Sequence, residues 1–321
     1  GFFLEPEGSL DVVLIGASQL YTGYSAPLAW RDYGFTSYPL AVSNIPARLY
    51  GSLLTEAVNR QHPKLIVVDI DGFLTDEDPE KLEANLRKWL DNMPWSRNKI
   101  ETIRTCVPAE LQTSFYFNIA KYHANWYQPD AWLPVQQRLR AMDKTGYSLT
   151  KSFEAIGQSL TAADEPDTRP LTLSDVNAQY LRDFCAQAQA LGANVLFLRM
   201  PHRTQTTDPN VFADVAAVVG SYGYDLLDLH DAFDTIGLDR CADFMDSDHL
   251  NAIGMETFTA WFGQYLSERY DLTTAHSETV TAEWQRCADF MAQILPTCQQ
   301  QAADNTKQTL NEFSAAFDAY R

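Results

Sequence analysis

The chain has 321 residues, 45% of them hydrophobic and 21% charged, which is typical of a globular protein with a substantial core and argues against extended disorder. Its formal net charge of -18 gives a surface that repels nucleic acid and anionic lipid, so we expect neither as a partner. No apolar run approaches the roughly 20 residues needed to span a bilayer, and no signal peptide is visible.

The sequence opens abruptly. Gly1-Phe2-Phe3-Leu4 is followed by a predicted strand that begins near residue 11. We therefore expect the chain to be a soluble fragment of a longer protein.

Apolar segments alternate between two kinds of pattern along the chain. Continuous apolar runs, rich in β-branched residues in the first two, predict buried parallel strands at 12–15, 65–70 and 194–198, with a weaker strand at 224–229. Apolar residues at helical spacing predict helices at 47–60, 174–191, 208–220 and 252–270. Strands that alternate with helices predict an α/β fold with a parallel sheet.

Two regions depart from this alternation. Residues 75–170 are rich in Trp, Tyr, Asn and Pro, and we interpret them as a long insertion with helices of its own. Residues 276–321 form a predicted helical tail with two apolar stripes. The first stripe is interrupted at Pro296, and the second runs from Leu310 to Tyr320. We expect the tail to cover the domain, and a partner-binding role is the alternative.

The five cysteines include no C-x-x-C pair, which argues against a structural zinc site. Cys287 and Cys298 lie eleven residues apart. They either bridge two C-terminal helices or remain buried free thiols.

Ser18 is the first residue of chemical interest. It follows the strand at 12–15 in the sequence Gly16-Ala17-Ser18, where open α/β sheets place their ligands. A helix that starts near residue 19 would direct free N–H groups toward an oxyanion. The alternative is a helix N-cap. A second glycine after the serine is missing, which disfavours the α/β-hydrolase type of nucleophile turn.

Asp246 and His249 lie three residues apart, a spacing that lets the carboxylate hold the imidazole while its other nitrogen faces a serine. A metal site is the alternative for this acidic stretch, residues 225–248. Its donors are Asp228, Asp231, Asp234, Asp239, Asp243, Asp246, Asp248 and His249. They fit no EF-hand spacing, so we expect no metal and no cofactor.

Together, the Gly16-Ala17-Ser18 turn and Asp246-x-x-His249 resemble the SGNH (GDSL-type) hydrolase superfamily. More narrowly, the chain resembles bacterial SGNH-like proteins associated with membrane-bound O-acyltransferases, such as those of teichoic-acid D-alanylation and alginate acetylation. The stretches that carry this likeness are 11–18, 34–40 (GFTSYPL), 61–69 (QHPKLIVVD), 91–99 (DNMPWSRNK), 121–126 (KYHANW) and 246–254 (DSDHLNAIG).

The resemblance implies a three-layer α/β/α catalytic domain over residues 8–272, with the insertion at about 75–170 and a helical extension at 273–321. It also implies Ser18 as nucleophile, His249 as base and Asp246 as the residue that orients the base. The superfamily's Gly-x-Asn-Asp block is missing. For the oxyanion site we therefore name the N–H groups of Ser18 and Gln19, with Asn44 as a substitute whose alternative role is in a turn.

Three further residues are candidate substrate contacts. His202 and Arg203 follow the strand at 194–198 and so fall on the ligand-facing edge, and His123 could reach the site from the insertion. For His123 the alternative is a histidine that serves packing.

From these residues we expect acyl transfer, of an O-acetyl group in the first instance, or ester hydrolysis through an acyl-Ser18 intermediate. The substrate would be an acylated small molecule or, as the resemblance implies, a cell-surface glycan. The resemblance also implies an extracytoplasmic location, membrane tethering in the full-length protein and a membrane-bound O-acyltransferase as partner. The competing hypothesis is a non-catalytic glycan-binding or scaffold protein that serves such a partner.

Overall fold

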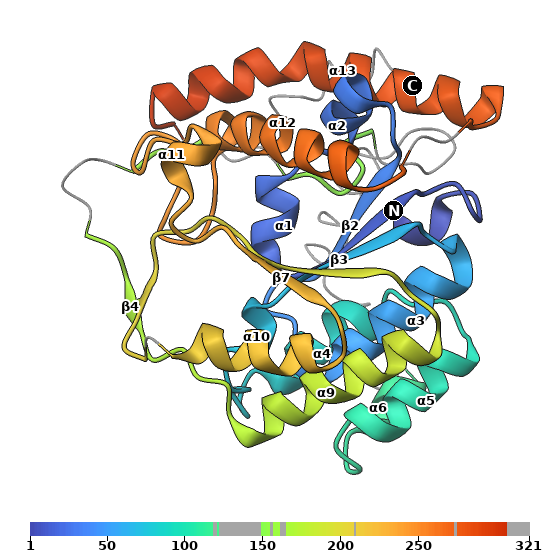
Figure 1. Ribbon diagram of the computed structural model, residues 1–321. Helices are drawn as coiled ribbons and strands as arrows, with labels where there is room; N and C mark the ends of the chain where they lie inside the picture. The colour runs from blue at the N-terminus through green and yellow to red at the C-terminus, as the bar shows by residue number, and fades with distance from the viewer. Residues whose placement is uncertain are drawn as a thin grey trace.

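A parallel sheet of five strands forms the centre of the protein (Figure 1). The structure is a computed structural model that describes residues 1–117, 121, 149–154, 157–160, 165–208, 210–272 and 275–306. In spatial order the strands are β2 (Ser37–Ala41), β1 (Val12–Gly16), β3 (Leu65–Asp69), β5 (Val195–Arg199) and β7 (Asp225–Asp228).

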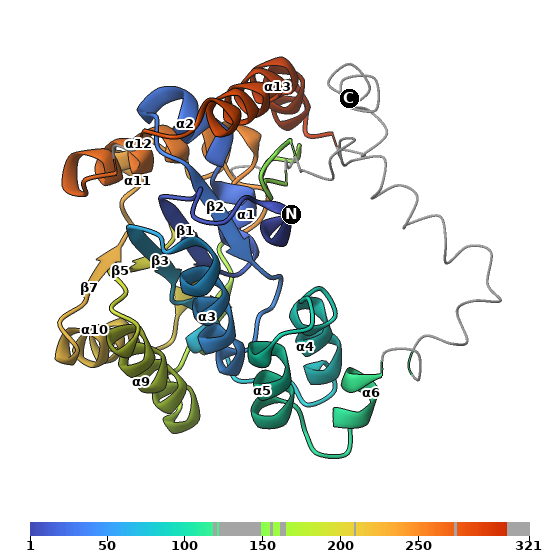
Figure 2. The same cartoon turned by 90° about the vertical axis from the view of Figure 1, so that its right-hand side faces the viewer.

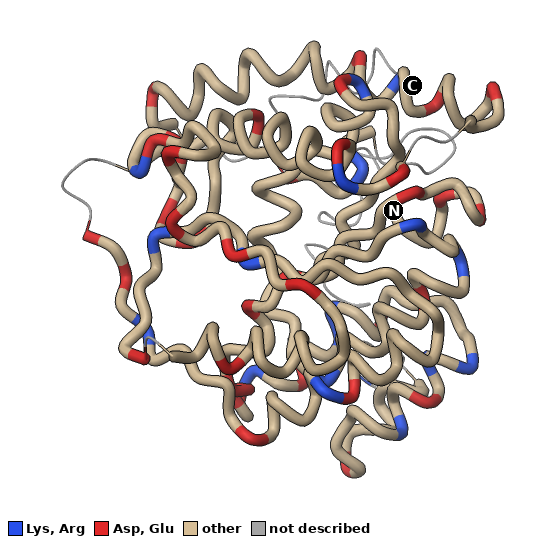
Figure 3. Tube along the Cα trace, in the orientation of Figure 1, with Lys and Arg blue, Asp and Glu red and all other residues tan. Residues whose placement is uncertain are grey.

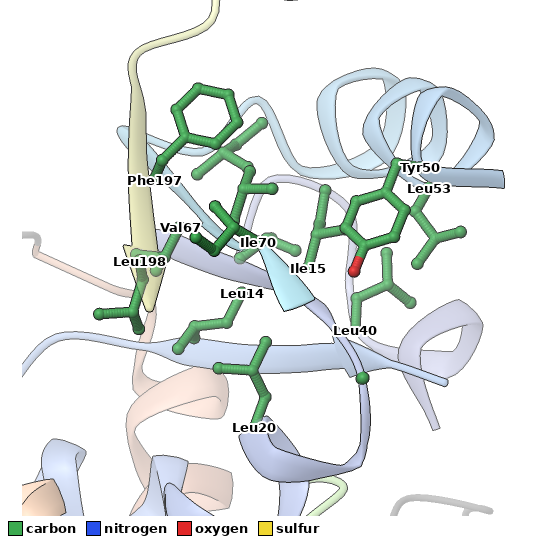
Figure 4. Packing of buried hydrophobic residues seen from close by; sticks show 14 of the residues in the cluster. Leu14, Ile15, Leu20, Leu40, Tyr50, Leu53, Val67, Ile70, Phe197 and Leu198 are labelled. Carbon is green, nitrogen blue, oxygen red and sulfur yellow. The ribbon is translucent and has the colours of Figure 1, made fainter. Parts of the chain in front are cut away.

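The strands form because their side chains are covered on both faces of the sheet. Every residue of β1, β3 and β5 is buried, as their continuous apolar sequences predict. Figure 4 shows Leu14 near Leu20 and Ile15 near Tyr50, two side chains that come from segments on opposite sides of the sheet. The edge strand β7 is half-buried or exposed throughout, which explains its weaker sequence pattern.

Helices cover both faces of the sheet (Figure 1). One layer contains α1 (Ser18–Gly23), α2 (Ala26–Tyr33), α12 (Ala252–Arg269) and α13 (Glu278–Ala303). The other contains α3 (Tyr50–Gln61), α9 (Asp175–Ala190) and α10 (Val211–Ser221). Hydroxyl or amide side chains cap three of these helices at their N-termini, namely Ser174 of α9, Asn251 of α12 and Ser277 of α13.

Three further helices lie between β3 and α9 in the sequence and stand outside α3, away from the sheet (Figure 2). They are α4 (Leu82–Leu90), α5 (Arg97–Cys106) and α6 (Gln112–Tyr116). The shorter elements are the helix α11 (Phe233–Ile236), the paired strands β4 (Thr168–Arg169) and β6 (Gln205–Thr206), and 3-10 turns at Phe2–Leu4, Ala47–Leu49 and Asp71–Phe73.

The predicted α/β fold with a parallel sheet is confirmed, and each predicted strand and helix of its alternating part is present within a few residues of its expected bounds. The first apolar stripe of the tail is also confirmed, because Trp284, Ala288, Met291 and Leu295 are all buried. The second stripe, from Leu310 to Tyr320, lies outside the described residues.

One expectation for the tail was wrong, and one open alternative is decided. Pro296 does not interrupt the helix, because α13 runs through it from Glu278 to Ala303. The missing N–H removes one backbone hydrogen bond, and burial of the apolar stripe on both sides of the proline keeps the helix together. Cys287 and Cys298 are buried on this one helix, about 16 Å apart along its axis, and form no disulfide, so of the two alternatives the unbridged buried thiols are confirmed.

Acidic side chains outnumber basic ones along the chain and are spread over helices and loops rather than gathered on one element (Figure 3). Among the described residues, no helix has the length and apolar character needed to cross a membrane.

Candidate active site

The carboxyl ends of the parallel strands place Ser18 at one edge of the sheet. β1 ends at Gly16, and Ser18 is the first residue of α1. Gly16 permits a close approach here, since a Cβ at this position would lie 2.6 Å from Cβ of Asp69 and 2.8 Å from a methyl carbon of Leu20. The short turn between β1 and α1 therefore depends on a residue without a side chain.

Ser18, His249 and Asp246 form one chain of hydrogen bonds. Oγ of Ser18 lies 2.8 Å from Nε2 of His249. Nδ1 of the same ring lies 2.9 Å from each carboxylate oxygen of Asp246. A carboxylate only accepts hydrogen bonds, so Nδ1 carries the ring proton. Nε2 of the neutral ring is therefore the acceptor for the Ser18 hydroxyl, as a general base requires.

The contact between Asp246 and His249 favours the carboxylate and the imidazolium over their uncharged forms. Burial opposes the imidazolium, but the hydrogen bond and the charge of Asp246 outweigh burial, so the pKa of His249 lies above its usual value. Burial likewise opposes the Asp246 carboxylate, but contact with His249 outweighs it and the pKa of Asp246 lies below its usual value. The side chain of Asp246 is 45% exposed, so water screens part of this interaction.

The loop that carries Asp246 and His249 is held closed at its base. Phe244 and Leu250 form an antiparallel bridge, and the N–H of Met245 donates to the carbonyl of His249 at 2.9 Å. Within the loop, Oδ1 of Asp246 accepts the N–H groups of Asp248 and His249, each at 2.8 Å. The carboxylate is thus fixed by backbone as well as by the imidazole.

Helix α12 approaches this loop closely. Its cap, Asn251, accepts the N–H groups of Ile253 and Gly254 and donates to the carbonyl of Ala242 at 2.6 Å. A Cβ on Gly254 would lie 2.3 Å from the carbonyl oxygen of Asp243, so only glycine fits between helix and loop. The D-x-x-H-L-N-A-I-G stretch is therefore one structural unit.

A pocket of about 450 Å³ opens over Ser18 and His249. Its walls come from the turn after β1, the segment 44–46, the segment from β3 into α4, and the loops around residues 169–171, 202–204 and 248. The start of the predicted insertion, residues 75–85, therefore forms part of the pocket wall.

Of the other residues predicted for the site, Gln19, Asn44 and His202 line this pocket. Asn44 is exposed, its φ is 52°, and its amide nitrogen lies 3.4 Å from Oγ of Ser43, which fits the turn role proposed as the alternative. Arg203 is not among the lining residues, and its N–H donates to the Ser247 carbonyl at 2.6 Å. His123 lies outside the described residues.

Sequence analysis missed two carboxyl groups next to the serine. Asp69 ends β3, and Asp71 follows it and accepts a hydrogen bond from the Gln19 side chain at 3.1 Å. Burial raises the pKa of Asp71 to about 6, with smaller opposing effects of nearby charges. Burial, and then the charge of Asp71, raise the pKa of Asp69 well above its usual value. Asp69 and Asp71 stand at the carboxyl end of β3, where open α/β sheets bind their ligands, and this position could have identified them from the sequence.

A second network connects the pocket wall to the loop between Phe244 and Leu250 that carries Asp246 and His249, called the triad loop below. Asp248 accepts a hydrogen bond from the Thr204 hydroxyl and pairs with Arg169. The carbonyl of Ser247 accepts the N–H groups of Arg203 and Thr204. These contacts join the loop after β5 to the residues between Asp246 and His249.

The acidic stretch 225–248 shows no metal-binding arrangement. No group of three or more His, Cys, Asp or Glu side chains suited to a metal ion occurs in the part of the chain that the structure describes.

Comparison with known proteins leaves the family open. No family model matches the chain, and no curated protein matches it. Among solved structures, the glycerol complex of a fructuronate-tagaturonate epimerase from Cohnella laeviribosi is 10% identical, with a TM-score of 0.19 over 99% of this chain and 80% of its own. A likeness this weak carries no argument about fold or function.

Proposed function

We propose that the chain is a serine-dependent acyl-group enzyme that transfers or hydrolyses an ester-linked acyl group, in the first instance O-acetyl. The observation that supports this most directly is the hydrogen-bond chain Ser18–His249–Asp246 at the mouth of a pocket. The reaction needs a hydroxyl, a neutral base and a carboxylate, and the three residues supply these at a pH above the His249 pKa.

The proposed reaction has two steps. First, Oγ of Ser18 attacks the ester carbonyl carbon and passes its proton to Nε2 of His249, and the imidazolium then protonates the departing alcohol. Second, water or an acceptor hydroxyl gives its proton to His249 and attacks the acyl carbon. The bond to Oγ then breaks and the proton returns to Ser18.

Negative charge on the carbonyl oxygen would be met by the N–H groups of Ser18 and Gln19 at the start of α1. The exposed Asn44 is the weaker candidate for this role. Asp246 stabilises the imidazolium in both steps through its two 2.9 Å contacts.

We further propose that residues 8–272 form a three-layer SGNH-type domain, with α4–α6 belonging to a helical insertion and α13 to a C-terminal extension. The turn after β1 and the D-x-x-H loop before α12 are the two features that support this proposal. On the same resemblance we propose a cell-surface glycan as acceptor, a membrane-bound O-acyltransferase as partner and an extracytoplasmic location.

The decisive experiment is intact-mass analysis after incubation with a fluorophosphonate and, separately, with an activated acetyl ester. A single adduct that maps to Ser18 is expected, because His249 activates this hydroxyl alone. Ser43 is the control, since it lies near the pocket and has no imidazole partner among the described residues. The adduct should persist in Ser43→Ala and vanish in Ser18→Ala.

No adduct on the folded protein would overturn the enzyme proposal. That result would favour the second candidate function, a non-catalytic glycan-binding or scaffold protein that partners the acyltransferase. The missing Gly-x-Asn-Asp block is the sequence feature that favours this second candidate.

A further inference from the structure

We propose that the pocket selects an acceptor without negative charge and favours one that carries an ammonium group. This proposal rests on the proposed function, because it treats the pocket over Ser18 as the acceptor site. The charges of the pocket wall carry the argument.

The lining of the pocket is acidic. It holds five carboxylate residues and two basic residues, which are Asp71, Asp76, Glu77, Asp78 and Asp248 against Lys81 and Arg169. Both histidines of the lining are uncharged at a pH where the triad imidazole is a neutral base. A cleft lined mostly by one sign of charge concentrates ligands of the opposite sign.

Three of the five carboxylates are already neutralised by partners. The pairs are Glu77 with Arg48, Asp78 with Lys81 at 3.0 Å, and Asp248 with Arg169. Their charges largely cancel at the distance of a ligand.

Asp71 and Asp76 have no cation partner within ion-pair distance among the described residues. Asp76 accepts hydrogen bonds from the Ser174 hydroxyl at 2.7 Å and from the Asn177 amide at 3.4 Å, and Asp71 accepts one from the Gln19 amide. These bonds hold both carboxylates in place. The charge of Arg199 offsets part of the charge of Asp71 without an ion pair, and Asp76 has no ion pair among the described residues. A cationic ligand group would compensate the charge that remains, and an anionic one would be repelled.

The side chain of His202 is a second, independent indication that this part of the pocket wall binds a ligand. This side chain is 2% exposed and lines the pocket. The backbone of Thr204 has a small effect on the ring, but neither ring nitrogen makes a hydrogen bond of normal geometry to the described residues. The polar groups of Thr204 beside the ring have other partners. Its carbonyl accepts a hydrogen bond from Nε2 of His230 at 2.8 Å, and its hydroxyl donates to Asp248.

The pKa of His202 lies well below its usual value because of burial first and the charge of Arg199 second. The ring is therefore neutral and adds no positive charge to offset the two carboxylates. A neutral imidazole has one donor and one acceptor nitrogen, which a hydroxyl or ammonium group can satisfy when the ring turns toward it.

The test measures binding without chemistry, in the Ser18→Ala protein. Three probes of similar size carry different charges: 2-aminoethyl, 2-hydroxyethyl and carboxymethyl β-glucoside. Titration calorimetry is run near pH 8, above the pKa of about 6 to which burial raises Asp71. We expect the aminoethyl glucoside to bind about tenfold more tightly than the carboxymethyl glucoside, with the neutral probe between them. The ratio of the affinities of the aminoethyl and carboxymethyl probes, called the gap below, should shrink at an ionic strength of about 0.5 M.

Asp76→Asn removes one uncompensated charge and keeps an oxygen that accepts from Ser174, so the gap should fall to about threefold. Asp214→Asn is the matched control, because Asp214 is exposed on α10 and absent from the pocket lining. It should leave the gap unchanged.

The proposal is overturned if the carboxymethyl probe binds as tightly as the aminoethyl probe, if both variants change the gap equally, or if no probe binds. These outcomes are separate from the failure of the acyl-enzyme proposal, because the Ser18→Ala protein forms no adduct in any case. Reaction of the unsubstituted protein with fluorophosphonate tests that proposal alone.

Discussion

At the scale of single residues, Ser18 and His249 act as a unit through the 2.8 Å contact between Oγ and Nε2. Ser18→Ala and His249→Ala should each lower kcat for an activated acetyl ester by about 10⁴-fold to 10⁶-fold, because either change removes the same attack step. The double variant should be no slower than the slower single variant. Steady-state kinetics on purified, folded protein measures all three. Losses that multiply would mean that the two residues act in separate steps.

Asp246→Asn should alter the pH dependence as well as the rate. The enzyme needs neutral His249, so activity is lost as pH falls through the His249 pKa, which Asp246 holds above its usual value of about 6.5. Without the carboxylate, burial remains as the main effect and lowers that pKa. The acid limb of kcat/KM should therefore move to lower pH, and the plateau should fall because the imidazolium is less stabilised.

The pH profile separates this role from a merely structural one. A variant that only loosened the loop would lower the plateau and leave the acid limb in place. An acid limb that stays put or moves to higher pH would contradict the assignment of Asp246.

At the scale of elements, the contact between α12 and the triad loop sets the geometry of the site. Gly254→Ala places a methyl group 2.3 Å from the Asp243 carbonyl oxygen, a backbone atom that cannot move without the loop. We expect a loss of about 1–3 kcal/mol in the free energy of unfolding, together with a large loss of activity. Urea denaturation and kinetics measure the two effects.

Gly220→Ala is the matched control for this prediction. Gly220 lies near the end of α10, and a Cβ there would meet nothing within 4 Å. Alanine should leave activity intact and stabilise the protein slightly, by at most about 1 kcal/mol, because it costs less backbone entropy in a helix. Equal activity in both glycine variants would show that α12 does not position the loop.

The elements of the sheet could be predicted because their cause is local. In β1 and β3, a run of buried β-branched residues is visible without knowledge of its neighbours. The path of α13 through Pro296 could not be predicted, because the helix is held by burial of Trp284 and Leu295 against other parts of the chain. Tertiary packing overrode a local signal there.

The residues of the site also fall into those that could be predicted from the sequence and those that could not. Asp246 and His249 could be paired from sequence since three residues separate them, whereas the contact of His249 with Ser18 spans 231 positions and needed the resemblance. The acidic wall was not predicted at all. Asp71 and Asp76 become part of the pocket only because the segment after β3 turns back over Ser18.

At the scale of the whole molecule, one buried ion pair joins distant parts of the chain. Nζ of Lys151 lies 2.8 and 2.9 Å from the carboxylate oxygens of Glu5, and both side chains are at most 1% exposed. The ammonium also lies 5.0 Å from the ring centroid of Trp284 in α13. The pair therefore links the N-terminal segment, the short stretch 149–154 and the C-terminal helix.

Lys151→Met should destabilise the protein by about 3–5 kcal/mol near neutral pH, because it leaves the Glu5 carboxylate buried without its partner. Burial already raises the pKa of Glu5 against the effect of Lys151, and loss of the lysine raises it further. A raised folded-state pKa favours the protonated acid, so the variant loses stability as pH rises through that pKa and regains it as pH falls. Urea denaturation at about pH 5 and about pH 8 measures the difference.

The double variant Lys151→Met, Glu5→Gln isolates the cause. It has no carboxylate to protonate, so the pH dependence added by Lys151→Met should disappear and much of the stability near pH 8 should return. If the single variant were equally unstable at both pH values, the cost would come from lost packing against Trp284 rather than from an unpaired charge. Rates with the acetyl ester should change little in the folded fraction of either variant, since neither residue lines the pocket over Ser18.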